Sequence, residues 1–204
     1  MSTTAEHVGT EPMYPALAAP PAPARPRVLL VGTVLGSSAV VMAFAALIGA
    51  YVAVRAGTDG AWLPDGVIIP LSPGNMAAVT LLMSVITLQW ARYAIANDDR
   101  PNAYVALGLT LVLGLAYINS IVYLLTQMGA AIARSVPEFM IYAISGFHIA
   151  TIIAAMVFVA LMAFRTLGGQ YSGRDSEGVA AAAVFWNASV AIYLVIWYAV
   201  YVTK

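Results

Sequence analysis

The sequence has no cysteine, few charged residues and only two histidines. The absence of cysteine excludes disulfides, iron–sulfur clusters, thiolate metal sites and a cysteine nucleophile. Charged residues make up 9% of the 204 residues, and the nine basic and nine acidic side chains cancel. No net positive field is left to attract nucleic acid. We therefore expect no nucleic-acid partner.

Hydrophobic residues are abundant instead: they make up 62% of the chain, and the mean hydropathy is strongly positive. Five intervals without Asp, Glu, Lys or Arg are each long enough for a spanning helix, which takes roughly 20 apolar residues. We expect the spans at about 28–54, 73–96, 103–127, 138–165 and 178–202. Membrane β-strands have only about 9–11 residues of alternating polarity. The predicted fold is an all-α integral membrane protein, a five-helix bundle over residues 28–204.

Residues 1–27 differ in composition, because they contain six of the eleven prolines. We expect a flexible Pro/Ala-rich tail, and its pattern is not that of a cleaved signal peptide. Basic residues flanking the spans show a two-to-one bias between the two sides. The N-terminal side has Arg25, Arg27, Arg92, Arg100, Arg165 and Arg174, and the opposite side has Arg55, Arg134 and Lys204. The positive-inside rule then predicts a cytoplasmic N-terminus and tail, and a C-terminus outside.

His148 is the one histidine in the predicted spans, within the stretch "AISGFHIAT". A six-coordinate haem needs two axial ligands, and this chain offers no second histidine in the membrane. We interpret His148, Asn119 and Asn187 as structural polar groups that hydrogen-bond between helices, with a single hydrogen bond expected for His148. We expect no catalytic, cofactor-binding or metal-binding residue. A pore or carrier lined by such neutral groups is the alternative.

Two patterns of side-chain size predict helix contacts. Gly32 and Gly36 form a G-x-x-x-G, which predicts a closely packed helix pair. In the last span, aromatic residues are spaced seven, four and four and share one helix face: Trp186, Tyr193, Trp197 and Tyr201. We interpret this stripe as a packing seam that ends in an outer interfacial belt at Tyr198 and Tyr201. A quinone or haem pocket is the alternative for the stripe.

Six segments of the chain form an ordered pattern: Gly36-Ser-Ser-Ala-Val-Val-Met-Ala-Phe44, Tyr51-Val-Ala-Val-Arg55, Trp62-Leu-Pro64, Ile144-Ser-Gly-Phe-His148, Ala180-Ala-Ala-Ala-Val-Phe-Trp186 and Trp197-Tyr-Ala-Val-Tyr201. In this order they resemble subunit III of the haem–copper cytochrome c oxidases in its short five-helix bacterial form. The resemblance covers residues from about 28 to 204. No single motif is specific, and their order and spacing carry the identification.

The chain also departs from this family's pattern. Ala39 stands where the family has a buried glutamate, and Thr151 stands where a second histidine follows the Gly-Phe-His motif. Asn187, Val190 and Tyr193 replace His, Asp and Trp of the closing helix. The resemblance is therefore to a divergent member that has lost nearly all of the family's membrane-buried ionisable groups.

The resemblance implies a non-catalytic subunit of the aerobic respiratory chain in the bacterial cytoplasmic membrane. Its five helices would form a V whose cleft holds phospholipid, and it would pack against catalytic subunit I and other oxidase subunits. Haem and copper would belong to those partners. We expect four residues to contact lipid: Arg92, Arg100, Arg165 and Trp186. An accessory subunit of another respiratory complex, such as nitric oxide reductase, and a small independent transporter are the alternatives.

Overall fold

The computed structural model describes residues 27–132, 134–169 and 176–203. Within them lie five helices long and apolar enough to cross a membrane, and no strand. They are α1 (Val28–Ala56), α2 (Leu71–Ala96), α3 (Arg100–Gln127), α4 (Val136–Leu167) and α5 (Glu177–Ile196), and α5 continues into a π-helix, η1 (Trp197–Val202). The prediction of an all-α protein with five spanning helices is confirmed. The expected tail lies, except for Arg27, outside the described residues.

Three helices begin two or three residues earlier than the sequence analysis expected, because polar residues and prolines form their first turns. In α3, Asp99 is the N-cap and accepts a hydrogen bond from the Asn102 backbone N–H at 3.3 Å, with proline in the first turn. In α4, Ser135 is the N-cap and is again followed by proline. Proline is tolerated there because the first helical N–H groups have no intrahelical partner.

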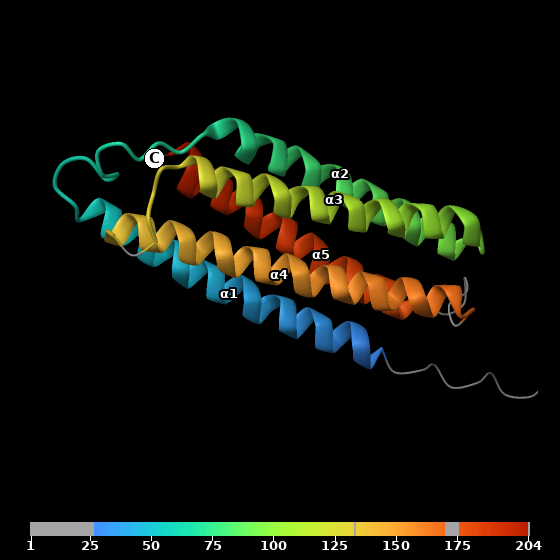
Figure 1. Ribbon diagram of the computed structural model, residues 1–204. Helices are drawn as coiled ribbons and strands as arrows, with labels where there is room; N and C mark the ends of the chain where they lie inside the picture. Colours follow the sequence, from blue (N-terminus) through green and yellow to red (C-terminus); the bar gives the residue numbers. More distant parts are fainter. Residues whose placement is uncertain (1–26, 133, 170–175, 204) are drawn as a thin grey trace, which may run out of the picture.

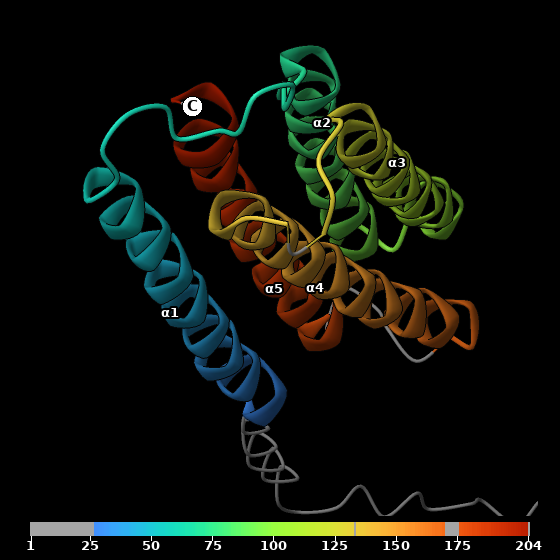
Figure 2. The ribbon, with the colours of Figure 1, turned by 60° about the vertical axis from the view of Figure 1, so that its left-hand side comes forward.

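The helices lie side by side and the chain crosses from one end of the bundle to the other five times (Figure 1). Figure 2 shows α1 at one edge, α4 and α5 in the middle, and the α2–α3 hairpin at the other edge. Hydrogen bonds at both ends show that α1 runs parallel to α5. The Glu177 carboxylate accepts from the Leu30 N–H at 3.0 Å, and Arg55 Nη1 donates to Thr203 Oγ1 at 3.1 Å.

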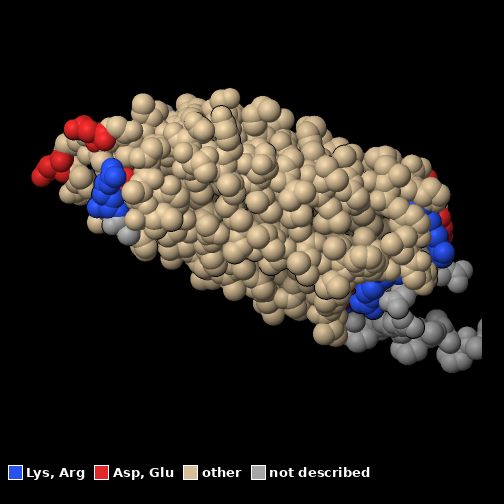
Figure 3. Space-filling model, in the orientation of Figure 1, with Lys and Arg blue, Asp and Glu red and all other residues tan. Residues whose placement is uncertain are grey.

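Charged side chains gather at the two ends of the bundle, and the face shown in Figure 3 is uncharged between them. One end, the basic rim, carries Arg27, Arg92, Arg100 and Arg165, at the start of α1 and α3 and the end of α2 and α4. The other end carries Arg55 and Arg134. Arg25, Arg174 and Lys204 lie outside the described residues. An apolar belt between two charged ends is the surface expected of a protein that spans a bilayer.

Candidate functional site

The interior of the bundle holds a polar seam centred on His148 of α4, which is 1% exposed. His148 Nε2 lies 2.9 Å from the carbonyl oxygen of Ser189 on α5, and Nδ1 lies 2.6 Å from the hydroxyl of Tyr117 on α3. A carbonyl only accepts, so Nε2 carries the proton and donates, and Nδ1 accepts from Tyr117. His148 thus makes two hydrogen bonds, and joins three helices, where the sequence analysis expected one.

Aromatic rings enclose the imidazole. The ring centroids of Phe44, Tyr117 and Tyr193 lie 5.6, 5.5 and 5.6 Å from that of His148. With both nitrogens bonded within the protein, the ring has no lone pair directed at open space. No group of three or more His, Asp or Glu side chains in the described part of the chain could hold a metal ion. His148 is therefore placed to join helices by hydrogen bonds.

The aromatic stripe of α5 points into the bundle and fastens α5 to its neighbours. Trp186 Nε1 donates to Ser84 Oγ at 2.9 Å, and the Tyr193 hydroxyl donates to the Gly74 carbonyl at 2.8 Å. The hydroxyls of Tyr201 and Ser145 lie 2.7 Å apart. These bonds tie α5 and its continuation η1 to α2 and α4.

Two expectations for this stripe are wrong. Tyr201 is not in an outer interfacial belt, because its hydroxyl is paired with Ser145 and the residue is fully buried; only Tyr198 is exposed. Trp186 does not contact lipid, because it is fully buried. Its indole fills the space left by Gly114 of α3, where an added Cβ would lie 2.9 Å from Trp186 Cη2.

The G-x-x-x-G face of α1 is also not where the sequence analysis expected it. Gly32 and Gly36 are exposed, and a Cβ added at either would meet nothing within 4 Å. The bundle-facing side of α1 consists instead of the buried residues Ser37, Phe44 and Tyr51. The close helix pair expected at these glycines is therefore not formed within the described residues.

The two structural asparagines lie in different surroundings. Asn187 on α5 is half-buried, and its Oδ1 atom is buried without a hydrogen-bond partner, as is Ser37 Oγ on α1. Asn119 is exposed on α3. Neither side chain forms an interhelical hydrogen bond to a described residue, unlike the side chain of His148.

Two hollows on the surface of the described residues are relevant to ligand binding. An apolar groove of about 200 Å³ runs between α1 and α5, and its lining is Val41, Phe44, Ala45, Ile48, Ala188, Ala191, Ile192 and Val195. A more polar cavity of about 320 Å³ lies at the basic rim between α2 and α5, and its lining is Gln89, Arg92, Tyr93, Ala96, Ser176 and Val179. Arg92 Nη1 donates to Gln89 Oε1 at 2.9 Å there. Arg100 and Arg165 are exposed at the same rim.

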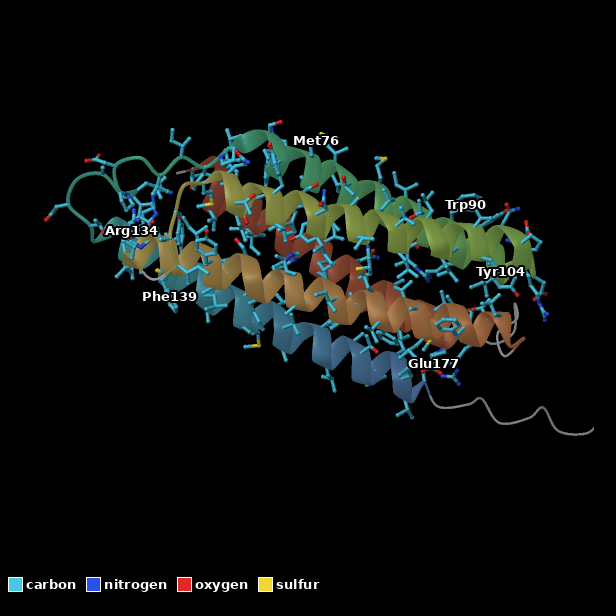
Figure 4. The ribbon with its side chains drawn as sticks, viewed as in Figure 1. Met76, Trp90, Tyr104, Arg134, Phe139 and Glu177 are labelled. Carbon is cyan, nitrogen blue, oxygen red and sulfur yellow. The ribbon has the colours of Figure 1, made fainter. Side chains whose placement is uncertain are left out.

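Trp90 and Tyr104 lie towards the basic rim, the end of the bundle at which Glu177 stands, whereas Arg134 and Phe139 mark the opposite end (Figure 4). Trp90 is 40% exposed, and the Tyr104 hydroxyl donates to the Thr166 carbonyl at 3.4 Å. Aromatic side chains at this depth are typical of the membrane interface, where an apolar ring and a polar tip are both satisfied.

Two buried residues of the bundle, Glu138 and Tyr117, are not among those predicted from the sequence. The buried Glu138 carboxylate accepts from the Ala131 N–H at 3.1 Å and from Ser135 Oγ at 2.7 Å. A local sequence pattern could have predicted this role of Glu138, since Ser135 and Glu138 form the S-x-x-E pattern of a capping box. No local pattern predicts the role of Tyr117, because its partner His148 lies 31 residues away in the chain.

Comparison with known proteins agrees with this architecture. The family description "Cytochrome c oxidase subunit III" matches residues 27–204. Cytochrome c oxidase subunit 3 of Strongylocentrotus purpuratus is 30% identical over 144 residues, which are 69% of this chain and 55% of that protein. The Cyprinus carpio protein is 28% identical over 145 residues, 70% of this chain and 55% of the relative.

A bacterial relative, described as a probable cytochrome c oxidase subunit 3 of Rickettsia bellii, is 25% identical over 148 residues, 71% of this chain and 53% of the relative. The chain spans about half the length of the curated relatives it matches. The low identities agree with a divergent sequence. On the match over residues 27–204, the chain belongs to the cytochrome c oxidase subunit III family.

Proposed function

We propose that this chain is the non-catalytic subunit III of a haem–copper cytochrome c oxidase in the bacterial cytoplasmic membrane. It packs against catalytic subunit I and other oxidase subunits, and haem and copper reside in those partners. The observation that carries the proposal is the closed seam around His148 in a chain of this family. Both imidazole nitrogens are used in joining helices, which supports a structural role for the one histidine of the spans.

The same proposal includes lipid binding. The groove between α1 and α5 is lined only by apolar side chains and has room for part of an acyl chain. At the basic rim, the cavity beside Arg92 combines a guanidinium with the polar tips of Gln89 and Ser176, which suits a lipid phosphate. Arg100 and Arg165 extend the positive charge along that rim. Each such charge contributes on the order of 1 kcal/mol near an anionic membrane surface.

The proposed orientation is supported by the same rim. Arg27, Arg92, Arg100 and Arg165 stand together at one end of the bundle, and Arg55 and Arg134 at the other. By the positive-inside rule the end with more arginine faces the cytoplasm. The C-terminus then lies outside. Labelling of an introduced cysteine at Thr58, between α1 and α2, by an impermeant thiol reagent on intact cells tests this, and protection of that cysteine until lysis would reverse the orientation.

Assembly is tested by purification of the chain in mild detergent through a C-terminal tag, followed by a visible spectrum and mass spectrometry. We expect a haem–copper catalytic subunit at one-to-one stoichiometry. Copurification of nitric oxide reductase instead would assign the chain to that complex. A colourless protein that stays monodisperse alone would overturn the subunit assignment, and transport in liposomes would then be measured.

Lipid binding is tested on the purified complex with Arg92→Gln, and with Arg134→Gln at the opposite rim as the matched control. We expect Arg92→Gln to lower the number of tightly bound anionic phospholipids by about one per complex, because the phosphate loses its guanidinium partner. Arg134→Gln should leave the lipid count unchanged. Equal lipid content in both variants would remove Arg92 from the lipid site without affecting the assembly result.

A further inference from the structure

The outward face of α3 carries a polar side chain among apolar ones. The buried side of α3 includes Thr110, Tyr117 and Ile121. Asn119 stands two residues from Tyr117 and therefore close to the opposite side of the helix, at 100° per residue. Its neighbours there are exposed and apolar or aromatic: Val112 62%, Leu115 62%, Val122 47% and Tyr123 54%. We call Val112, Leu115, Asn119, Val122 and Tyr123 the Asn119 face.

Asn119 lies well inside the span. It precedes Gln127, the last residue of α3, by eight residues, or about 12 Å at 1.5 Å per residue. The helix has 28 residues and exceeds the hydrocarbon thickness of roughly 30 Å. When the excess of about 12 Å is shared between its two ends, the carboxamide lies about 6 Å inside the hydrocarbon.

Three other polar side chains on the outer surface of the spans bond to their own helix, but Asn119 does not. Ser38 donates to the Val34 carbonyl at 2.9 Å, Thr80 to Met76 at 2.8 Å and Ser120 to Ala116 at 2.9 Å. No hydrogen bond joins the Asn119 carboxamide to any residue that the structure describes. An amide in hydrocarbon without a partner is unfavourable, and an acyl chain has no group that can bond to it.

We propose that the Asn119 face is a docking surface for a transmembrane helix of a neighbouring oxidase subunit, one that presents a hydrogen-bonding side chain at the depth of Asn119. The carboxamide both donates and accepts, so it fits an amide, hydroxyl or carboxyl partner. Polar residues of this kind hold helices together in membranes. The inference rests on the proposed function, since it takes its partner from the same complex.

Photo-crosslinking in the intact complex tests the surface. Benzoylphenylalanine replaces Val122 in the Asn119 face, and Val157, a similarly exposed position on α4, is the control. We expect Val122 to form an adduct with another oxidase subunit and Val157 to form none. A complex that copurifies normally but yields no adduct at Val122, or an adduct with a second copy of this chain, overturns this inference alone. A preparation without oxidase subunits overturns the proposed function as well.

The polar contact itself is tested by Asn119→Leu, with Asn119→Gln as the conservative variant. We expect Asn119→Leu to lower retention of the partner subunit in detergent about threefold, the scale of one interhelical hydrogen bond in membranes, and Asn119→Gln to restore most of it. Unchanged unfolding of the isolated chain shows that folding is intact, because Asn119 bonds to none of its described residues. Equal retention in Asn119→Leu and the unmodified chain overturns the proposal.

Discussion

α1 and α5 are similarly apolar and are packed in opposite ways. In the most hydrophobic stretch of α1, 11% of the residues are buried inside the chain. In the corresponding stretch of the last span, Glu177–Val202, 56% are buried. α5 carries large aromatic residues whose polar tips bond to α2, and Tyr201 of its continuation η1 pairs with Ser145 of α4. The outward side of α1 carries glycines that meet nothing. Hydropathy therefore shows that both helices belong in a membrane, and side-chain size and polar tips decide which one is enclosed by protein.

The attachment of α1 explains how a sparsely packed helix stays in place. Its middle contacts the bundle through Phe44, whose ring stacks on Phe147 with centroids 4.7 Å apart. Its two ends are tied to α5 by the Glu177–Leu30 bond and to Thr203 by Arg55. The Tyr51 hydroxyl also accepts from Trp62 Nε1 at 3.0 Å, which holds the following loop against the helix. α1 thus meets the bundle along one side only, whereas α5 is enclosed by its neighbours along its whole length.

The sharpest contrast is between two glycines. Gly114→Leu should destabilise the chain by about 3 kcal/mol, because the new side chain meets Trp186 and Met156, whose atoms lie 2.9 and 3.0 Å from an added Cβ. Gly36→Leu, on the open face of α1, should leave the stability of the isolated chain unchanged. SDS unfolding followed by tryptophan fluorescence measures both. Similar losses in the two variants would contradict the packing difference between the helices.

A smaller effect is expected in the polar seam. His148→Phe leaves the Tyr117 hydroxyl without its acceptor and removes one of the two hydrogen bonds of the Ser189 carbonyl, which keeps its partner within α5. We expect it to lower the free energy of unfolding by about 2 kcal/mol. Tyr117→Phe removes the hydroxyl that bonds to His148. The free energy of unfolding of the double variant His148→Phe/Tyr117→Phe should therefore exceed, by about 1 kcal/mol, the value obtained by adding the losses of the two single variants. SDS unfolding of the four proteins measures this coupling.

The same variant tests the purely structural role of His148. His148→Phe should leave the haem and copper content of the purified complex unchanged, because both ring nitrogens are bonded within the chain. A stoichiometric loss of haem or metal, or strict additivity in the double variant, would contradict the role assigned to the seam.

The smallest effect concerns the ends of α1. Glu177→Ala removes the acceptor for the Leu30 N–H, and loss of a helix cap costs roughly 0.5–1 kcal/mol. We expect faster amide exchange in the first turns of α1 and no change in α3 or the middle of α5, as measured by hydrogen–deuterium exchange. Glu177→Gln, which keeps an acceptor oxygen, is the control. Equal acceleration throughout the bundle would show that α1 is not held separately at its ends.

Some of these features can be predicted from the sequence alone, and others cannot. Five charge-free runs predicted five helices, because a charge in hydrocarbon is costly whatever the fold around it. The early starts of α3 and α4 follow from capping residues that hydropathy counts as loop. The orientation of the stripe on α5 was predicted as one face, but not how far it is buried, so the expectations for Trp186 and Tyr201 failed.

Composition and motif order were enough to predict which segments lie in the membrane, the number of spans and the family. These depend on composition and local order, which the chain carries without folding. Only the tertiary structure decided that His148 bonds to Tyr117 and Ser189, that Trp186 fills the space beside Gly114, and that Gly32 and Gly36 face outward. Such pairings join residues far apart in the sequence. In a membrane, lipid is as apolar as a neighbouring helix, so hydropathy cannot distinguish the two.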